Sequence, residues 1–346
     1  MKTIRDFGVR NKRVLVRADF NVPLSPPAGG QEKQGEILDD LRIRATLPTI
    51  DYLINNGAKI ILMSHLDSPG GKVVEELKLD KVQERLMEYL DLSITKAPDC
   101  IGPKIEKWTK EMRPGEILLL ENLRFRKEEE NNDENFAADL SKLGDIYIND
   151  AFGVSHRAHA SIVGVPKHLP SGAGFLLEKE IKTLNMILKN PDKPLIAIVG
   201  GVKAETKGAI IDRISKVADW VLVGNIIAKN IDGKKVLKPV DGAKDIGPKT
   251  IEIFKEKIFQ AKTVFWSGPL GMVEKKEFQK GSLEIAKSIV ESKAFSVAGG
   301  GETTEFINKI GFEDKFSYIS TGGGAMLEFL SGKKLPGIES LNVIIR

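Results

Sequence analysis

The segment PLIAIVGGVKAETKGAII, at residues 194–211, holds the clearest structural pattern in the chain. The continuous apolar run Leu195–Val199 predicts a buried strand, and the glycine pair that follows it precedes a segment able to begin a helix. Lys203 and Lys207 are four residues apart and share one face of that first helical turn. Backbone N–H groups at a helix N-terminus favour anions, so the pattern predicts a phosphate site. An ordinary strand–helix connection with solvated lysines also fits, and this stretch alone leaves both interpretations open.

The composition is that of a globular protein large enough for two domains. The chain has 346 residues, of which 41% are hydrophobic and 29% charged, and single cores rarely grow to this length. The net charge of +4 balances 52 basic against 48 acidic residues, which indicates neither a nucleic acid nor a membrane partner. Cys100 is the only cysteine, so an intramolecular disulfide is excluded. The N-terminus lacks an apolar signal core, and we expect a cytoplasmic protein.

In the first half of the chain, polar and basic side chains follow one predicted strand after another. The strands are predicted at residues 13–18, 59–63, 116–120 and 145–148, with helices at 40–56, 79–90 and 135–143. This alternation is typical of a parallel sheet, whose strands end at one edge. The polar and basic clusters would meet at that edge and form a basic rim suited to a small polyanion. These clusters contain Asp19, His65, Arg124 and Arg157. Local turns and structural histidines are the alternative, and no HxH or HExxH pattern indicates a metal.

In the second half, each predicted strand ends at glycine instead. The strands are predicted at 195–199, 220–223, 263–266, 295–298 and 318–320, and the helix at 175–189 connects the two halves. The runs Gly299–Gly301 and Gly322–Gly324 each precede a segment that can open a helix, as Gly200-Gly201 does. Backbone donors at such helix starts suit nucleotide phosphates. Neither run forms a GxGxxG, which argues against a dinucleotide dehydrogenase.

Ten motifs in order along the chain resemble those of the phosphoglycerate kinase family, over almost the full length. They are VRADFNVPL (16–24), LRIRATLPTI (41–50), GAKIILMSHL (57–66), LLENLRF (119–125), INDAFGVSHRAHAS (148–161), IVGGVK (198–203), DIGPKT (245–250), FWSGPLG (265–271), GGGETT (299–304) and STGGGA (320–325). So many ordered motifs in both halves do not arise by chance.

The resemblance implies an α/β protein of two doubly wound parallel-sheet (Rossmann-like) domains that face a cleft and are joined by the helix at 175–189. Residues 1–172 would bind the triose, with the tail 332–346 packing back on them, and residues 173–331 would bind the nucleotide. The implied reaction is reversible phosphoryl transfer between 1,3-bisphosphoglycerate and ADP, giving 3-phosphoglycerate and ATP. Mg²⁺ is the implied cofactor, the partners are these small molecules alone, and a monomer is the family expectation. Catalysis would rest on domain closure and on charge stabilisation of the phosphoryl group in flight.

The resemblance also assigns roles to single residues. The catalytic residues would be Arg42, Lys203, Gly323 and Gly324. The triose would be held by Asp19, Asn21, Arg42, His65, Arg124 and Arg157. The nucleotide would be held by Gly201, Lys203, Lys207, Ser267, Glu274, Gly300, Gly301, Glu302 and Thr303. Glu274 would contact the ribose, and Glu302 would also be the metal ligand with Thr303 beside it.

Four departures from the family pattern bear on activity. Asp67-Ser68 stands where the pattern has glycine and arginine before a proline, and losing that base would weaken triose binding about 10- to 100-fold unless Lys72 replaces it. Ser267 stands in place of asparagine, and Glu302 in place of aspartate. The segment after Asn225 is short, which predicts weak or unselective recognition of the nucleotide base.

Two other functions stay open at this stage. The departures at residues 67–68 would also suit a kinase that acts on another small phosphorylated carboxylic acid. The shortened nucleotide domain would suit a non-catalytic relative that binds a phosphorylated ligand or a protein.

Overall fold

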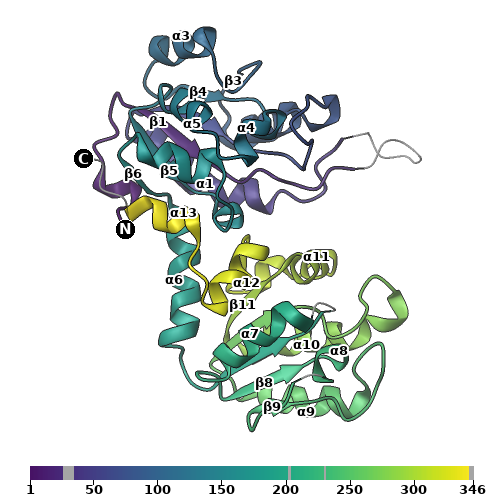
Figure 1. Ribbon diagram of the computed structural model, residues 1–346. Helices are drawn as coiled ribbons and strands as arrows, with labels where there is room; N and C mark the ends of the chain where they lie inside the picture. Colours follow the sequence, from purple (N-terminus) through teal and green to yellow (C-terminus); the bar gives the residue numbers. More distant parts are fainter. Residues whose placement is uncertain (26–34, 202–203, 230, 343–346) are drawn as a thin grey trace. The chain divides into compact units, whose positions relative to one another are not determined.

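The computed structural model describes residues 1–25, 35–201, 204–229 and 231–342 (Figure 1). The chain forms two compact units, one made of Met1–Lys179 with Lys334–Arg346 and the other of Glu180–Lys333. The division falls inside helix α6 (Phe175–Lys189). The domain limits expected from the sequence, 1–172, 173–331 and 332–346, therefore differ by a few residues from the compact units, because the connecting helix contributes to both of them.

The first unit is built on a six-stranded sheet with the strand order β3-β4-β2-β1-β5-β6, in which every neighbouring pair is parallel. Its strands are β1 (Arg13–Arg17), β2 (Lys59–Met63), β3 (Ile94–Lys96), β4 (Ile117–Leu119), β5 (Ile146–Asn149) and β6 (Ser171–Ala173). Its α-helices are α1 (Leu41–Asn55), α2 (Asp80–Leu90), α3 (Pro103–Glu111), α4 (Lys127–Glu130), α5 (Glu134–Ser141) and α13 (Pro336–Glu339).

The second unit repeats this plan, with the parallel strand order β12-β11-β10-β7-β8-β9. Its strands are β7 (Leu195–Val199), β8 (Trp220–Val223), β9 (Val236–Leu237), β10 (Thr263–Ser267), β11 (Phe295–Gly299) and β12 (Tyr318–Ser320). Its helices are α7 (Ala204–Ile214), α8 (Asn225–Ala228), α9 (Pro248–Phe259), α10 (Lys280–Ser292), α11 (Gly301–Lys309) and α12 (Gly324–Ser331). Helix α7 packs against α12, and α9 packs against α10 (Figure 1).

The nine predicted strands are confirmed, with ends that differ by at most one residue. Central strands of a parallel sheet are covered on both faces, so they are apolar throughout, and every residue of β7 is buried. The pattern did not predict β3, β6 and β9, which are two or three residues long and lie at or near the sheet edges. Strands this short carry too few residues to show a period.

Strand order reverses at one point in each sheet, and open α/β sheets usually bind their ligands at this point. In the second unit the chain runs from β7 outward to β9, then crosses back to β10 on the other side of β7. The loops that follow β7 and β10 therefore begin side by side at the carboxyl edge, where open α/β sheets bind ligands. In the first unit β1 and β5 have the same relation.

Candidate active site

The loop after β1 and the first turn of α1 form one corner of the basic rim. Arg42 Nη1 donates to the carbonyl of Asn21 at 2.9 Å and lies 3.4 Å from Asp19 Oδ1. The other carboxylate oxygen of Asp19 is buried and accepts no hydrogen bond within the described residues. Asn21 Oδ1 accepts from the backbone N–H of Asp67 at 2.8 Å, which ties this loop to the loop after β2. The sequence-predicted residues Asp19, Asn21 and Arg42 therefore lie together.

His65, directly after β2, is buried and neutral. Its Nδ1 lies 3.3 Å from Arg17 Nη2, and because a guanidinium can only donate, Nδ1 is the acceptor. Burial, followed by the charges of Arg17, Arg124 and Arg42, holds the His65 pKa well below its usual range. The ring proton is thus on Nε2, which leaves a neutral hydrogen-bond donor at this edge of the sheet.

Arg124 is buried, and one of its N–H donor groups has no hydrogen-bond partner within the described residues. Only 3% of its side chain is exposed, and its Nη1 donates to the carbonyl of Asp67 at 2.7 Å and to Ser68 Oγ at 3.4 Å. Its Nη2 has no hydrogen-bond partner among the described residues. Burial, and then the nearby charge of Arg157, lowers the Arg124 pKa. A buried, under-satisfied guanidinium beside a second arginine is a site that an anion would stabilise.

The departures at residues 67–68 have a structural consequence at this rim. Asp67 adopts a left-handed backbone conformation with φ of +54°, and its side chain and that of Ser68 are exposed. Arg124 holds the loop through the backbone carbonyl and the serine hydroxyl. Lys72, the base suggested as a replacement for the missing arginine, is exposed. Arg157 is exposed as well, so the rim combines the buried Arg124 with the half-buried Arg42 and the solvated Arg157.

In the second unit, two glycine turns interlock at the reversal point. Gly200 N–H donates to the carbonyl of Ser267 at 3.0 Å, and Gly201 N–H donates to that of Pro269 at 2.8 Å. A Cβ on Gly200 would collide with the carbonyl oxygens of Gly268 and Pro269, and one on Gly268 would collide with Gly200. Gly201 and Gly268 have φ of +88° and +93°, a region that side chains disfavour. Only glycine fits this junction.

Lys207, one turn into α7, lies against the end of β10. Its Nζ donates to Ser267 Oγ at 2.8 Å, so the serine in place of the family's asparagine still contacts this lysine. Burial lowers the Lys207 pKa to about 8, and the nearby Glu302 carboxylate acts in the opposite direction. Thr303 is fully buried and its hydroxyl accepts from Gly268 N–H at 2.6 Å, a bond that joins α11 to the interlocked turns.

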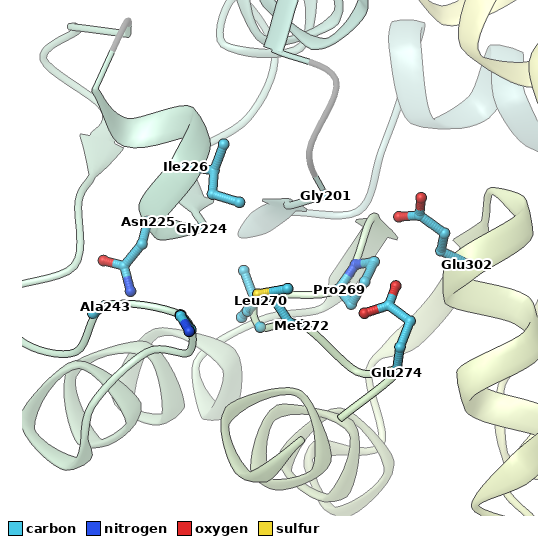
Figure 2. Close-up of a pocket in the computed structure, with 12 residues that line it drawn as sticks. Gly201, Gly224, Asn225, Ile226, Ala243, Pro269, Leu270, Met272, Glu274 and Glu302 are labelled. Atoms are coloured by element: carbon cyan, nitrogen blue, oxygen red, sulfur yellow. The ribbon is translucent and has the colours of Figure 1, made fainter. Parts of the chain in front are cut away.

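A cavity of about 180 Å³ opens beside these turns (Figure 2). Three sequence-predicted residues line it, namely Gly201, Glu274 and Glu302. Its other lining residues were not predicted, because they come from loops that are distant in sequence: Gly224, Asn225, Ile226, Ala243, Lys244, Pro269, Leu270, Gly271 and Met272. Figure 2 shows the two carboxylates at one end and Asn225, Ile226 and Ala243 at the other.

Several predicted nucleotide ligands lie next to this cavity without lining it. Gly300 precedes α11 with φ of +103°, and a Cβ there would approach Ser267 Oγ at 3.4 Å. Gly301, the first residue of α11, has open space around it. Lys203 lies outside the described residues.

Gly323 and Gly324 form the start of α12, where the sequence predicted an anion-binding helix end. Gly323 caps the helix with φ of +46°. The preceding loop is fixed by Glu180, whose carboxylate accepts from Ser320 Oγ at 2.8 Å and from Thr321 N–H at 2.7 Å. Burial raises the Glu180 pKa to about 7. The sequence did not single out Glu180, because in the 175–189 helix it reads as one more solvated glutamate.

The chain combines two parallel α/β units. One has a basic rim, and the other has a glycine-lined cavity beside a buried lysine. These features are those of a two-domain α/β phosphotransferase. A family model described as phosphoglycerate kinase matches residues 4–236 and 228–333. The chain belongs to the phosphoglycerate kinase family, and it is a kinase that transfers a phosphoryl group to and from a carboxyl group.

Relatives and solved structures agree with this assignment. The chain is 42% identical to phosphoglycerate kinase of Finegoldia magna over 398 aligned positions, covering 99% of both chains. It is 40% identical to that of Moorella thermoacetica, covering 98% of both. The crystal structure of phosphoglycerate kinase from Pyrococcus horikoshii OT3 matches with a TM-score of 0.84 and 32% identity, over 99% of this chain and 98% of that one. The structure from Coxiella burnetii matches with a TM-score of 0.82 and 32% identity, over 98% of each.

The comparisons also bear on the short segment after Asn225. The Finegoldia magna alignment spans 398 positions, whereas this chain has 346 residues, so positions present in the relative are absent here. The family match breaks into two parts that meet at residues 228–236. Within the described residues, only α8 and β9 lie between β8 and α9.

The described residues lack two further features. They contain no helix that is both long and apolar enough to cross a membrane. They also contain no group of three or more His, Cys, Asp or Glu side chains arranged to hold a metal ion.

Proposed function

We propose that the first unit of this phosphoglycerate kinase holds the triose on its basic rim and the second holds the nucleotide in the glycine-lined cavity. The observation that carries the proposal is Arg124, which is buried, charged and has an unused Nη2 donor. Glu130 Oε1 lies 3.4 Å from Arg124 Nε and opposes part of its charge, but a buried Nη2 donor without an acceptor still costs free energy until a ligand accepts from it. The remote phosphate of 3-phosphoglycerate or 1,3-bisphosphoglycerate would supply the partner.

The other residues of the rim would act around that phosphate. The exposed Arg157 and the neutral Nε2–H of His65 would donate to it, while Asp19, Asn21 and Arg42 would hold the carboxyl end of the substrate. Arg42 is already oriented by the Asn21 carbonyl, so it needs little reorganisation to meet developing charge on the transferred group.

On the nucleotide side, charge stabilisation would come from lysines and backbone donors. Lys203 and the α12 start at Gly323-Gly324 would stabilise the phosphoryl group in flight, and Lys207 would bind the nucleotide phosphates. Phosphoryl transfer leaves the protein little covalent work, so this positioning is the catalysis. Glu274 would contact the ribose, and the remaining nucleotide residues would shape the phosphate end of the cavity: Gly201, Ser267, Gly300, Gly301 and Thr303.

Mg²⁺ fits the second unit through one carboxylate. Glu302 is exposed, lines the cavity and faces Gly201, where a Cβ would lie 3.4 Å from its Oε2. Mg²⁺ is commonly held by one or two carboxylates together with substrate phosphates, and Glu302 would be that ligand. The ion would neutralise charge on the nucleotide phosphates. Thr303 would support it only indirectly, because its side chain is fully buried and its hydroxyl accepts from Gly268 N–H. The enzyme would work as a monomer in the cytoplasm.

The test is phosphorylation of 3-phosphoglycerate by the purified protein with Mg-ATP, with Lys203→Ala and Lys309→Ala compared with the wild type. Lys309 is exposed at the end of α11 and serves as a matched control. We expect loss of about 1000-fold or more in kcat for Lys203→Ala, as for other groups that stabilise charge in the transition state, and no change for Lys309→Ala. An active Lys203→Ala variant would contradict the mechanism. A wild type that phosphorylates a different small phosphorylated acid instead would redirect the assignment of the rim.

A further inference from the structure

The cavity of the second unit is acidic at one end and has no carboxylate among the described lining residues at the other. Glu274 and Glu302 lie at one end, while Leu270 and Met272 lie between them and the loop containing Ala243 (Figure 2). If the phosphates lie near Gly201 and Glu302, as the proposed function requires, the nucleotide base must occupy the opposite end. That end is formed by residues 225–226 of α8 and by the loop 241–246.

The loop 241–246 is held firmly against the cavity. Lys244 accepts at its carbonyl from Met272 N–H at 3.0 Å, and Asn225 Nδ2 donates to the Asp245 carbonyl at 2.8 Å. The Asp245 carboxylate accepts from Gly281 N–H at 2.7 Å and from Ile246 N–H at 2.9 Å. Because these bonds fix the backbone at Lys244 and directly after it, the origin of that side chain is fixed beside the base end.

Lys244 is the only cationic residue among the described residues that line the cavity. It forms no ion pair within the described part of the chain, and its ammonium lies 5.3 Å from the ring centroid of Phe278. Such an exposed cation–π contact is weak. The neighbouring walls are apolar at Ile226, Leu270 and Met272, and one of the two N–H donors of the uncharged Asn225 amide is engaged by the Asp245 carbonyl. Lys244 is therefore the principal side-chain donor for the edge of a base.

We propose that Lys244 makes this cavity select 6-oxopurine nucleotides, those of guanine or hypoxanthine, over adenine nucleotides. Guanine presents two adjacent acceptors, N7 and O6, whereas adenine presents N7 beside the N6 amino donor. An ammonium group can serve both acceptors of the first edge but meets a donor on the second. The inference rests on the proposed function for the location of the base. The shortened segment led us to expect weak or unselective base recognition, whereas Lys244 predicts a preference for 6-oxopurine over adenine nucleotides.

The test is calorimetric binding of Mg-ADP, Mg-GDP and Mg-IDP to the purified full chain. Hypoxanthine shares O6 and N7 with guanine but lacks the 2-amino group, so it isolates the contact. For the wild type we expect Mg-GDP and Mg-IDP to bind with similar affinity, about 10-fold tighter than Mg-ADP. Lys244→Met keeps the approximate length of the side chain and removes its charge. The preference for Mg-GDP and Mg-IDP over Mg-ADP should then fall below about twofold. Lys244→Glu should favour Mg-ADP, and Lys249→Met, an exposed change outside the cavity, should match the wild type.

Equal or tighter binding of Mg-ADP by the wild type would overturn the inference. So would a preference that survives in Lys244→Met, or a wild type that binds none of the three nucleotides. Phosphoryl transfer is measured separately with each nucleotide. A Lys244-dependent preference in binding without any transfer would support the inference and contradict the proposed function. Phosphoryl transfer with equal rates for ATP and GTP would support the proposed function and contradict the inference.

Discussion

Lys207 gives the sharpest prediction, because its charge should change within an accessible pH range. Its side chain is 7% exposed, and burial lowers its pKa to about 8. About nine-tenths of free molecules therefore carry the ammonium at pH 7, about half at pH 8 and only a few per cent at pH 9.5. In the proposed function the nucleotide phosphates would bind the charged form, so nucleotide affinity should fall as the pH rises above 8, and binding near pH 8 should take up about half a proton.

The magnitude follows from one charge-assisted hydrogen bond. Such a bond to a phosphate oxygen is worth about 2 kcal/mol, or a factor of about 30 in affinity. Lys207→Met should bind ADP about 30-fold more weakly than the wild type at pH 7, and the difference should shrink to a few-fold at pH 9.5. The groups that face Lys207 are the Ser267 hydroxyl and the Glu302 carboxylate.

Calorimetry in two buffers of different ionisation enthalpy measures both the affinity and the proton uptake. Lys207→Arg is the second variant, because a guanidinium stays charged throughout this range. Its affinity should be flat between pH 7 and pH 9.5, with no proton uptake from this position. The reasoning is refuted if the wild type shows the same affinity at both pH values, or if Lys207→Met loses the same factor at each.

Three further predictions concern the turns, the basic rim and the start of α6. Gly200→Ala should lower the free energy of unfolding by about 3 kcal/mol, because the added Cβ collides with backbone carbonyls. Gly301 has open space around it, so Gly301→Ala should raise the free energy of unfolding by about 0.5 kcal/mol. Equal denaturation midpoints for the two variants would contradict this. Arg124→Met should weaken 3-phosphoglycerate binding about 100-fold, and the exposed Lys72→Met less than about threefold; a large loss for the second would show that this lysine compensates. Burial raises the Asp150 pKa to about 7, so the native state keeps a proton that the unfolded state loses near pH 4, and stability falls as the pH rises between these values. Asp150→Asn keeps the acceptor for two α6 amides, and its unfolding free energy should rise relative to the wild type from pH 4 to pH 8.

Much of the fold was predictable because its signals are local. The strand Leu195–Val199 is a continuous apolar run, and glycine marks its end. The basic rim was predictable for a related reason, since parallel strands bring consecutive loop clusters to one edge. Asp19, His65 and Arg124 follow different strands, yet they lie together once the sheet forms.

What the sequence could not reveal depends on distant partners. Glu180 reads as a surface glutamate until the loop at residues 320–321 packs on it. Lys244 and Asn225 become cavity residues only because a loop twenty residues away returns to α8. The neutral state of His65 arises from its burial and then from arginines contributed by three segments. Each of these facts belongs to tertiary contacts, which a periodic pattern does not encode.

The interlocked turns also order the steps by which the second unit can assemble. The amides of Gly200 and Gly201 bond to carbonyls at residues 267 and 269, more than sixty residues later in the chain. A nascent chain that ends before β10 can pair β7 with β8, but it cannot complete the turn after β7. Nucleotide can therefore stabilise only a unit in which β10 has already joined the sheet. During synthesis, nucleotide binding would act as a late step that locks a finished sheet rather than as a template for an early intermediate.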